Sequence, residues 1–194
     1  MRDIAIVFAR APRLGTVKRR LARDIGARAA LRFQRRTLFR LLRTLAADRR
    51  FDTVLALTPD AARLRLPARV GRIGQGHGDL GRRMARAFRR FPCRRVAIIG
   101  SDIPAAGAAD LAAAFGELGR AEAVFGRAMD GGYWLVGMGP RRPARPFAAV
   151  RWSTAHALAD TRANFHGRRV ALLRPLSDVD RKADWATLPI PWRY

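Results

Sequence analysis

VAIIGSDIP, residues 96–104, is the stretch from which the fold of this 194-residue chain can be worked out. Its four leading apolar residues and the glycine after them are typical of a strand buried on both faces of a parallel sheet. Asp102 follows where the chain leaves the sheet, and in open α/β sheets ligands bind at this carboxyl edge. Pro104 restricts the backbone just beyond it. Asp102 is therefore a candidate ligand-binding residue, with capping of a helix that begins near Ala106 as the alternative.

The length and composition indicate one folded domain over residues 1–194. A chain of this size can bury a sizeable core, and its 49% hydrophobic residues are typical of globular proteins. No apolar run approaches the roughly 20 residues that span a bilayer, and the amino-terminal sequence lacks a signal-peptide pattern. Cys93 is the only cysteine, so an internal disulfide framework is excluded. We expect a cytoplasmic protein without a membrane span.

The net charge of +24 is the unusual feature of the composition. Such a charge raises the possibility of a nucleic-acid or other polyanionic partner. All basic residues except Lys18 and Lys182 are arginines, and they are spread along the chain together with abundant alanine and glycine. This pattern indicates a bias toward GC-rich codons, and no nucleic-acid-binding motif accompanies the charge. We expect no dedicated nucleic-acid binding, and the retention of lysine at position 18 marks it as a candidate functional residue.

Strand-like and helix-like segments alternate along the whole chain. Strands are expected at residues 3–8, 53–57, 69–73, 96–99, 121–125 and 170–173, and residues 130–137 are expected to form a turn that leads into a further strand. Helices are expected from about residue 17, at 27–47, 82–90 and 108–118, and after Trp152. The strand at 69–73 is expected near an edge of the sheet, and Ser153 or Thr154 is expected to cap the helix after Trp152. The carboxyl-terminal segment with Trp185, Trp192 and Tyr194 is expected to pack on the body. The alternation predicts an α/β fold with a mostly parallel, Rossmann-like sheet flanked by helices.

The loop after the first strand has the layout of a phosphate-binding site. A buried strand, a glycine-bearing loop and a helix follow one another, and helix amino termini favour anions. Arg10, Arg13, Lys18 and Arg20 add positive charge around the loop. The loop is neither a Walker loop nor a dinucleotide fingerprint, because it lacks the glycine spacing of both.

Two further glycine-bearing segments have more than one interpretation. Residues 74–81 hold four glycines and either approach a ligand closely or form a flexible loop. His77 in this segment has no second histidine or cysteine at ligand spacing, so a zinc site is not expected. Asp130 with the two glycines after it is either a hairpin turn or a source of a catalytic carboxylate.

Six motifs in order resemble one protein family. They are FARAPRLGTVKRRL (8–21), QGHGDLGRRM (75–84), IIGSDIP (98–104), DGGYWLVG (130–137), WST (152–154) and DVDRKADW (178–185). Together they resemble the bacterial nucleotide-diphospho-sugar transferase-like family DUF2064, some members of which are assigned as glycosyltransferases of arsenosugar biosynthesis. This family is similar in fold to GT-A glycosyltransferases and to the molybdopterin and phospholactate guanylyltransferases. The resemblance implies a GT-A, nucleotide-diphospho-sugar transferase-like fold and a nucleotide sugar or nucleotide as donor.

The resemblance also implies roles for individual residues. Asp102 and Asp180 would hold Mg²⁺ or Mn²⁺, which needs only one or two protein carboxylates when phosphate oxygens complete its shell. Asp102 and Asp130 would be the catalytic residues, with Asp130 as a base toward a small-molecule acceptor. The nucleotide-binding residues would be Ala11, Pro12, Arg13, Gly15, Lys18, Arg20 and Ser101. The acceptor-side residues would be Asp79, Gly131, Gly132, Tyr133 and Trp152.

Three departures from the family pattern bear on the substrates. Arg19 stands where threonine is usual, a proline before Asp130 is lost around Arg127, and Arg181 replaces a threonine. None removes a charged anchor, but they affect which donor and acceptor fit. Three functions follow as hypotheses: a metal-dependent glycosyltransferase, a nucleotidyltransferase that joins a nucleoside triphosphate to a phosphorylated acceptor, and a non-enzymatic protein that binds anions or nucleic acid through charge alone.

Overall fold

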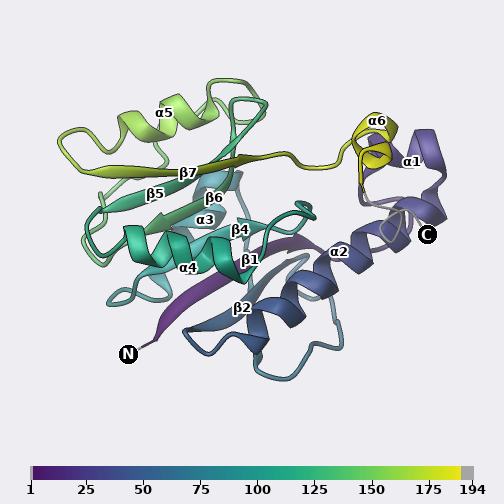
Figure 1. Cartoon of the computed structure of the whole chain (residues 1–194), viewed down its shortest axis with the longest axis horizontal. Helices are drawn as coiled ribbons and strands as arrows, with labels where there is room; N and C mark the ends of the chain where they lie inside the picture. Colours follow the sequence, from purple (N-terminus) through teal and green to yellow (C-terminus); the bar gives the residue numbers. More distant parts are fainter. Residues whose placement is uncertain (1, 189–194) are drawn as a thin grey trace.

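The computed structural model describes residues 2–188 and contains one seven-stranded sheet (Figure 1). The strands lie in the order β3-β2-β1-β4-β6-β5-β7. Their bounds are β1 Asp3–Arg10, β2 Phe51–Thr58, β3 Val70–Gly74, β4 Val96–Gly100, β5 Ala123–Ala128, β6 Tyr133–Met138 and β7 Val170–Leu176. The helices are α1 Arg19–Ile25, α2 Ala27–Ala47, α3 Leu80–Arg89, α4 Ala108–Glu117, α5 Ala157–Ala163 and α6 Lys182–Ala186.

The sheet is mostly parallel, as the alternating pattern predicted. β1 pairs in parallel with β2 and β4, β2 with β3, and β5 with β7. Only β6, among the described strands, runs antiparallel to both of its neighbours, β4 and β5. It enters the sheet through the turn at Asp130, so the hairpin interpretation of that segment is confirmed. β3 lies at one edge, as expected.

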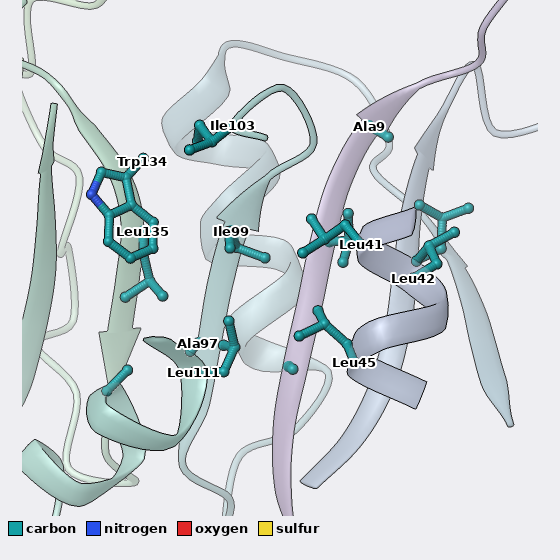
Figure 2. Close-up of a cluster of buried hydrophobic side chains, with 14 of the residues drawn as sticks. Ala9, Leu41, Leu42, Leu45, Ala97, Ile99, Ile103, Leu111, Trp134 and Leu135 are labelled. Atoms are coloured by element: carbon teal, nitrogen blue, oxygen red, sulfur yellow. The ribbon is translucent and has the colours of Figure 1, made fainter. Parts of the chain in front are cut away.

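Helices cover both faces of the sheet, and the core is divided accordingly. On one face, leucines of α2 and α4 pack against alternate residues of β1 and β4 (Figure 2). Phe115 of α4 and alternate residues of β2 belong to the same cluster. On the other face, α3 and the segment around α5 contribute Met84, Phe88 and Phe165. Each buried leucine or phenylalanine contributes on the order of 2 kcal/mol by leaving water. The rigid sheet edge that results positions the polar residues described below.

The strand that the opening motif predicted is β4, at the centre of the sheet. Its residues are buried between β1 and β6, with Ile6 and Val136 opposite Ile98. The alternative that Asp102 caps the following helix is wrong. Gly107 is the N-cap residue of α4, and the first turn is closed by Asp110, whose carboxylate accepts a hydrogen bond from the Gly107 N–H at 3.0 Å. The Asp102 carboxylate is thus left for another partner.

Two helix starts differ from the sequence predictions. The first helix begins at Arg19 rather than near Val17, because Lys18 has a left-handed backbone (φ 45°) that cannot continue a helix. α5 begins after His156, so neither Ser153 nor Thr154 is its N-cap residue. The Thr154 hydroxyl closes the preceding turn instead, donating to the Arg151 carbonyl at 2.8 Å. Trp185 packs against a small cluster with Val179, whereas Trp192 and Tyr194 lie outside the described residues.

The glycine-rich segment at 74–81 is packed onto the protein. The buried Gln75 amide donates to the carbonyls of Ala9 and Ala56 at 3.0 and 2.8 Å and so joins the ends of two strands. The Arg86 guanidinium lies where a side chain at Gly76 would be, and donates to the Gln75 carbonyl at 2.7 Å. The glycines make room for these contacts. In the part of the chain that the structure describes, no helix is both long and apolar enough to span a membrane.

Candidate active site at the carboxyl edge of the sheet

Three carboxylates meet at the carboxyl edge of the sheet. One oxygen each of Asp102, Asp178 and Asp180 lies within 4.8 Å of the others, and all three residues are partly buried. Asp102 follows β4, and the two others follow β7, the last strand of the sheet. Such a group of hard oxygen donors suits a divalent cation. The predicted pair Asp102 and Asp180 is therefore brought together, and Asp178 joins it.

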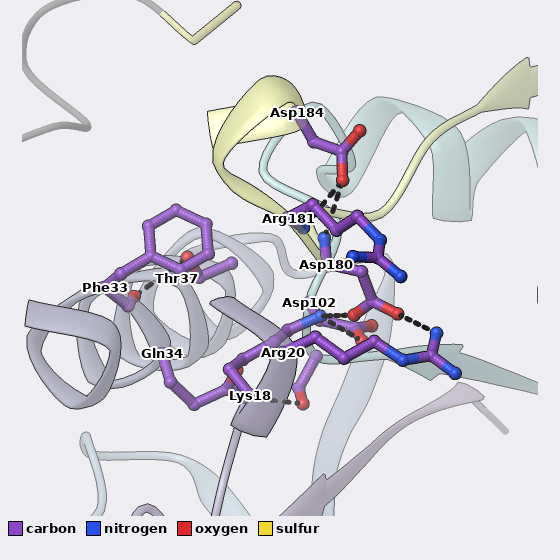
Figure 3. A network of polar contacts seen from close by, with 10 residues as sticks. Lys18, Arg20, Phe33, Gln34, Thr37, Asp102, Asp180, Arg181 and Asp184 are labelled. Carbon is purple, nitrogen blue, oxygen red and sulfur yellow. Dashed lines mark hydrogen bonds and ion pairs between the residues drawn. The ribbon is translucent and has the colours of Figure 1, made fainter. Parts of the chain in front are cut away.

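Sequence reasoning missed Asp178 as a ligand, although a signal was available. Residues i and i+2 of an extended segment lie on the same side of the chain. Val179 between the two aspartates is buried in the cluster formed with Leu21 and Phe33. Burial of the central residue therefore turns both carboxylates away from that cluster and toward Asp102. The Asp184 carboxylate fixes the same segment by accepting from the Asp180 N–H at 3.0 Å (Figure 3).

Lys18 joins the two chain segments that carry the carboxylates. Its ammonium donates to Asp102 and to Asp180, each at 2.9 Å, and its side chain is only 6% exposed (Figure 3). Arg20 approaches the outer oxygen of Asp180 at 3.4 Å. The strained left-handed backbone at Lys18 aims the side chain at this cluster, and such strain is concentrated at functional sites. The one lysine that the sequence analysis singled out is thus part of the site.

The charges shift one another's pKa values. Burial acts to lower the pKa of Lys18, but the two carboxylates outweigh it and raise that pKa above its usual value. Burial acts to raise the pKa of Asp180, but Lys18 and Arg20 outweigh it and hold that pKa low. Burial and the nearby Asp180 raise the pKa of Asp178 to about 6. Three carboxylates outnumber the Lys18 ammonium and the exposed Arg20 guanidinium, so the cluster keeps an excess of negative charge that a divalent cation would offset.

A cleft of about 420 Å³ adjoins the carboxylates. Its volume lies in the usual range for small-molecule sites. Asp102, Asp130 and Asp178 line it, and the rest of its wall comes from β1, β4, the start of β6, the start of α3 and the loop before α5. The cleft brings together both predicted catalytic residues, Asp102 and Asp130, and three of the predicted acceptor-side residues, Gly132, Tyr133 and Trp152.

The turn at Asp130 is a hairpin turn, and its carboxylate faces the cleft. The Asp130 carboxylate accepts from the Gly132 N–H at 2.9 Å, as in an ordinary turn, and it also lines the cleft. Gly131 has φ 84°, and a side chain there would collide with the Ala155 backbone. The turn therefore fits tightly against the loop that carries Trp152.

Several predicted site residues lie outside this cleft. Asp79 caps α3, accepting from the Arg82 N–H at 2.7 Å. Ser101 is buried, and its hydroxyl accepts from the Gln34 amide at 3.4 Å. In the phosphate loop, Ala11 is buried and hydrogen-bonds to the Thr58 carbonyl, Pro12 is half-buried, and Arg13, Gly15 and Arg20 are exposed beyond the end of β1. Of the predicted nucleotide-binding residues, Lys18 and Arg20 are those that the structure brings into contact with the carboxylates.

Residues 41–154 match the family of uncharacterized proteins conserved in bacteria, DUF2064. The chain belongs to this family. The matched segment includes Asp102 and Asp130 and so contains part of the site. Among curated proteins, no relative matches the chain.

Several solved structures resemble this chain over nearly its whole length. A candidate nucleotide-diphospho-sugar transferase from Desulfovibrio desulfuricans G20 is 28% identical, with a TM-score of 0.85 over 93% of this chain and 84% of that chain. The 4-diphosphocytidyl-2C-methyl-D-erythritol synthase of Anaerococcus prevotii shares the fold at 10% identity and a TM-score of 0.61, with 94% of each chain covered. Rv0371c of Mycobacterium tuberculosis, solved with manganese, is 18% identical, with a TM-score of 0.52 over 95% of this chain and 96% of that one. The DUF2064 chain thus has the nucleotide-diphospho-sugar transferase fold.

The excess charge of the cluster leads to a prediction about Asp178. In EDTA, Asp178→Asn is expected to stabilise the protein by about 1 kcal/mol, because it relieves repulsion among neighbouring carboxylates. Asp180→Asn is the matched contrast and is expected to destabilise it, because Lys18 loses a partner. Both variants should gain less stability than the native protein when Mn²⁺ is added. Thermal unfolding in EDTA and in Mn²⁺ measures all four changes, and equal shifts for the two variants in EDTA would contradict this account of the cluster.

Proposed function

We propose that this chain is a metal-dependent glycosyltransferase that uses a nucleotide-diphospho-sugar donor and a small-molecule acceptor. The observation that carries the proposal is the meeting of Asp102, Asp178 and Asp180 beside Lys18, with Asp102 and Asp178 lining the adjoining cleft. The diphosphate of such a donor must be bound by positive charge, which Lys18 and a cation held by the carboxylates would supply. The cleft next to this cluster can hold the reacting groups of the donor and the acceptor. The likeness to a candidate nucleotide-diphospho-sugar transferase supports the same assignment.

The residues present fit Mg²⁺ or Mn²⁺. Three carboxylate oxygens within 4.8 Å are the ligand type that these cations prefer, and phosphate and water oxygens would complete the shell. The manganese found with Rv0371c, a protein of the same fold, agrees with such a site. A bound divalent cation would neutralise charge on the departing diphosphate. Asp102, Asp178 and Asp180 would hold it.

The chain's own residues would bind the donor and orient the acceptor. The described residues take two of the three N–H donors of the Lys18 ammonium, which leaves one for a phosphate oxygen. Arg20 is exposed beside it and can bind a second oxygen. These two cations would stabilise the charge that builds on the leaving group.

Asp130 is the proposed general base. Its carboxylate lines the cleft and would accept the proton of an acceptor hydroxyl as the new bond to the sugar forms. The bond between the sugar's anomeric carbon and the diphosphate breaks in the same reaction, and the nucleoside diphosphate leaves with the bonding electrons. Gly132 holds one oxygen of Asp130 in place through its N–H.

Nucleotidyl transfer is the second candidate, because a synthase of that class shares the fold. The two differ in which donor is consumed. A thermal-shift screen of nucleoside di- and triphosphates and nucleotide sugars, with Mn²⁺, Mg²⁺ or EDTA at two salt concentrations, tests both, since a ligand of the folded state raises its stability.

We expect a metal-dependent shift with one nucleoside diphosphate and its sugar, lost in Asp102→Asn and retained at the higher salt. A preference for a triphosphate, with pyrophosphate released on turnover, would instead establish nucleotidyl transfer. A shift with any polyanion that ignores metal and Asp102→Asn and disappears with salt would refute both enzymatic functions.

A further inference from the structure

We infer that the cleft beside the carboxylates takes an uncharged, hydroxyl-bearing group of the second substrate and excludes a phosphorylated one. The inference rests on the proposed function, because it names the class of acceptor. It starts from the charge of the cleft. Asp102, Asp130 and Asp178 line it, and none of its described lining residues is basic.

The cleft is negatively charged, whereas the protein as a whole is positively charged. The chain carries 39 basic and 15 acidic residues, so a cleft lined by acids alone stands out against an arginine-rich surface. A phosphorylated acceptor would be a dianion beside carboxylates, without an arginine or lysine to pair with it. Sites that bind phosphates supply such cations or a row of backbone N–H groups. The cleft is therefore unsuited to a second phosphate.

A divalent cation would not reverse this conclusion. It would neutralise Asp102 and Asp178, but Asp130 comes from a different turn and does not belong to the group of three. The cations that contact the carboxylates are Lys18, which binds Asp102 and Asp180, and Arg20, which approaches Asp180, and neither of them lines the cleft. The positive charge of Lys18 and Arg20 is thus available to the donor's phosphates and absent from the lining of the cleft.

Apolar and aromatic side chains form the rest of the cleft. Phe8, Met84 and Ile98 form part of its lining, and Tyr133 and Trp152 add aromatic rings whose centroids are 6.4 Å apart. Such walls match the C–H face of a sugar ring or another uncharged ring. They do not favour a strongly hydrated anion, because no contact with these walls would offset the free-energy cost of removing its water.

Trp152 is held rigidly in this wall. An added Cβ at Gly81 would lie 2.8 Å from the indole, so the ring packs directly on the α3 backbone. Ser153, the next residue, has φ 61°, a strained conformation that turns the chain sharply after the ring. A rigid aromatic surface binds a ring at low cost in conformational entropy.

The hydroxyl requirement comes from the polar groups in the cleft. The Thr154 hydroxyl already donates to the Arg151 carbonyl, and the Tyr133 hydroxyl lies 3.4 Å from that of Thr161. Asp130 uses one oxygen for the turn, and the carboxylate has further lone pairs to accept a hydrogen bond. A neutral hydroxyl can donate to it, whereas a phosphate dianion cannot.

The test compares two probes that share one aryl group, an uncharged glycoside and a phosphate dianion. Binding of p-nitrophenyl glucoside and of p-nitrophenyl phosphate is measured by calorimetry, with Mn²⁺ and a saturating nucleoside diphosphate that occupies the donor's phosphate site. The glucoside is expected to bind at least about tenfold more tightly than the phosphate. Trp152→Ala is expected to weaken glucoside binding about tenfold.

Two variants at Asp130 separate charge from shape. Asp130→Asn keeps a side-chain oxygen for the turn and removes the charge. It should therefore improve binding of p-nitrophenyl phosphate and so reduce the preference for the glucoside over the phosphate. Asp130→Lys should reverse the preference. Equal or tighter binding of the phosphate by the native protein would overturn the inference, as would failure of the glucoside to bind.

A different result would refute the proposed function itself rather than the class of acceptor. If no nucleoside diphosphate gives a metal-dependent shift, glycosyl transfer is refuted, and the two probes added without nucleotide still report on the cleft. If the nucleoside diphosphate binds with metal and the glucoside does not, the proposed function stands and only the class of acceptor is wrong.

Discussion

Lys18→Met is expected to destabilise the protein by about 2 kcal/mol and to weaken nucleoside diphosphate binding about 100-fold. Loss of one partner from a buried ion pair costs about 3–5 kcal/mol. The two carboxylates are 36% and 41% exposed, so water recovers part of that cost. Loss of a buried charge that contacts a ligand carries a similar penalty in binding. Thermal unfolding should show a fall in melting temperature of about 4–8 °C for a chain of this length.

The second lysine of the chain supplies the matched control. Lys182 is exposed at the start of α6, and Lys182→Met removes the same charge from the same region. It should leave the melting temperature and nucleotide binding nearly unchanged. Mn²⁺ should raise the melting temperature of Lys18→Met more than that of the native protein, because no ammonium competes for Asp102 and Asp180. Equal effects of the two substitutions would show that Lys18 has no special role in joining the two segments.

Gly131→Ala is expected to cost about 2–4 kcal/mol and to abolish binding in the cleft. The glycine has φ 84°, a conformation that costs an alanine about 1 kcal/mol. Its Cβ would also overlap the carbonyl of Ala155, a backbone atom that cannot move without the loop. Overpacking of this kind adds about 1–3 kcal/mol. The loop from Trp152 to Ala155 would move, and the wall of the cleft would move with it.

Gly167→Ala isolates the collision from the backbone strain. Gly167 has φ 71°, and nothing lies within 4 Å of an added Cβ. It should cost only the conformational penalty of about 1 kcal/mol and leave glucoside binding unchanged. Urea unfolding and calorimetry measure the two quantities. If both glycine variants lost the same stability and both bound the glucoside, the tight fit between the turn and the loop would be disproved.

The candidate site was only partly predictable from sequence. Lys18 could be found because lysine is rare in this chain, and Asp102 because a carboxylate follows the central buried strand. Asp178 was missed because its role depends on which way Val179 faces, and that is decided by packing against Leu21 and Phe33. Ser101 and Asp79 follow the same kinds of local pattern, yet the first points into the core and the second caps a helix. Adjacent positions in a motif can thus face different surroundings.

The sequence by itself determined the mostly parallel sheet, its central strand and the loops that follow it. Buried runs, glycines and prolines act over a few residues, and these local preferences decide where strands and turns occur. Tertiary structure alone decided that Lys18 shares one cluster with Asp102 and Asp180, which lie 84 and 162 positions after it in the sequence. It also decided that the adjoining cleft is acidic in a strongly basic protein. Charge in a cleft depends on which side chains the fold turns inward, and a net charge summed over the chain contains no such information.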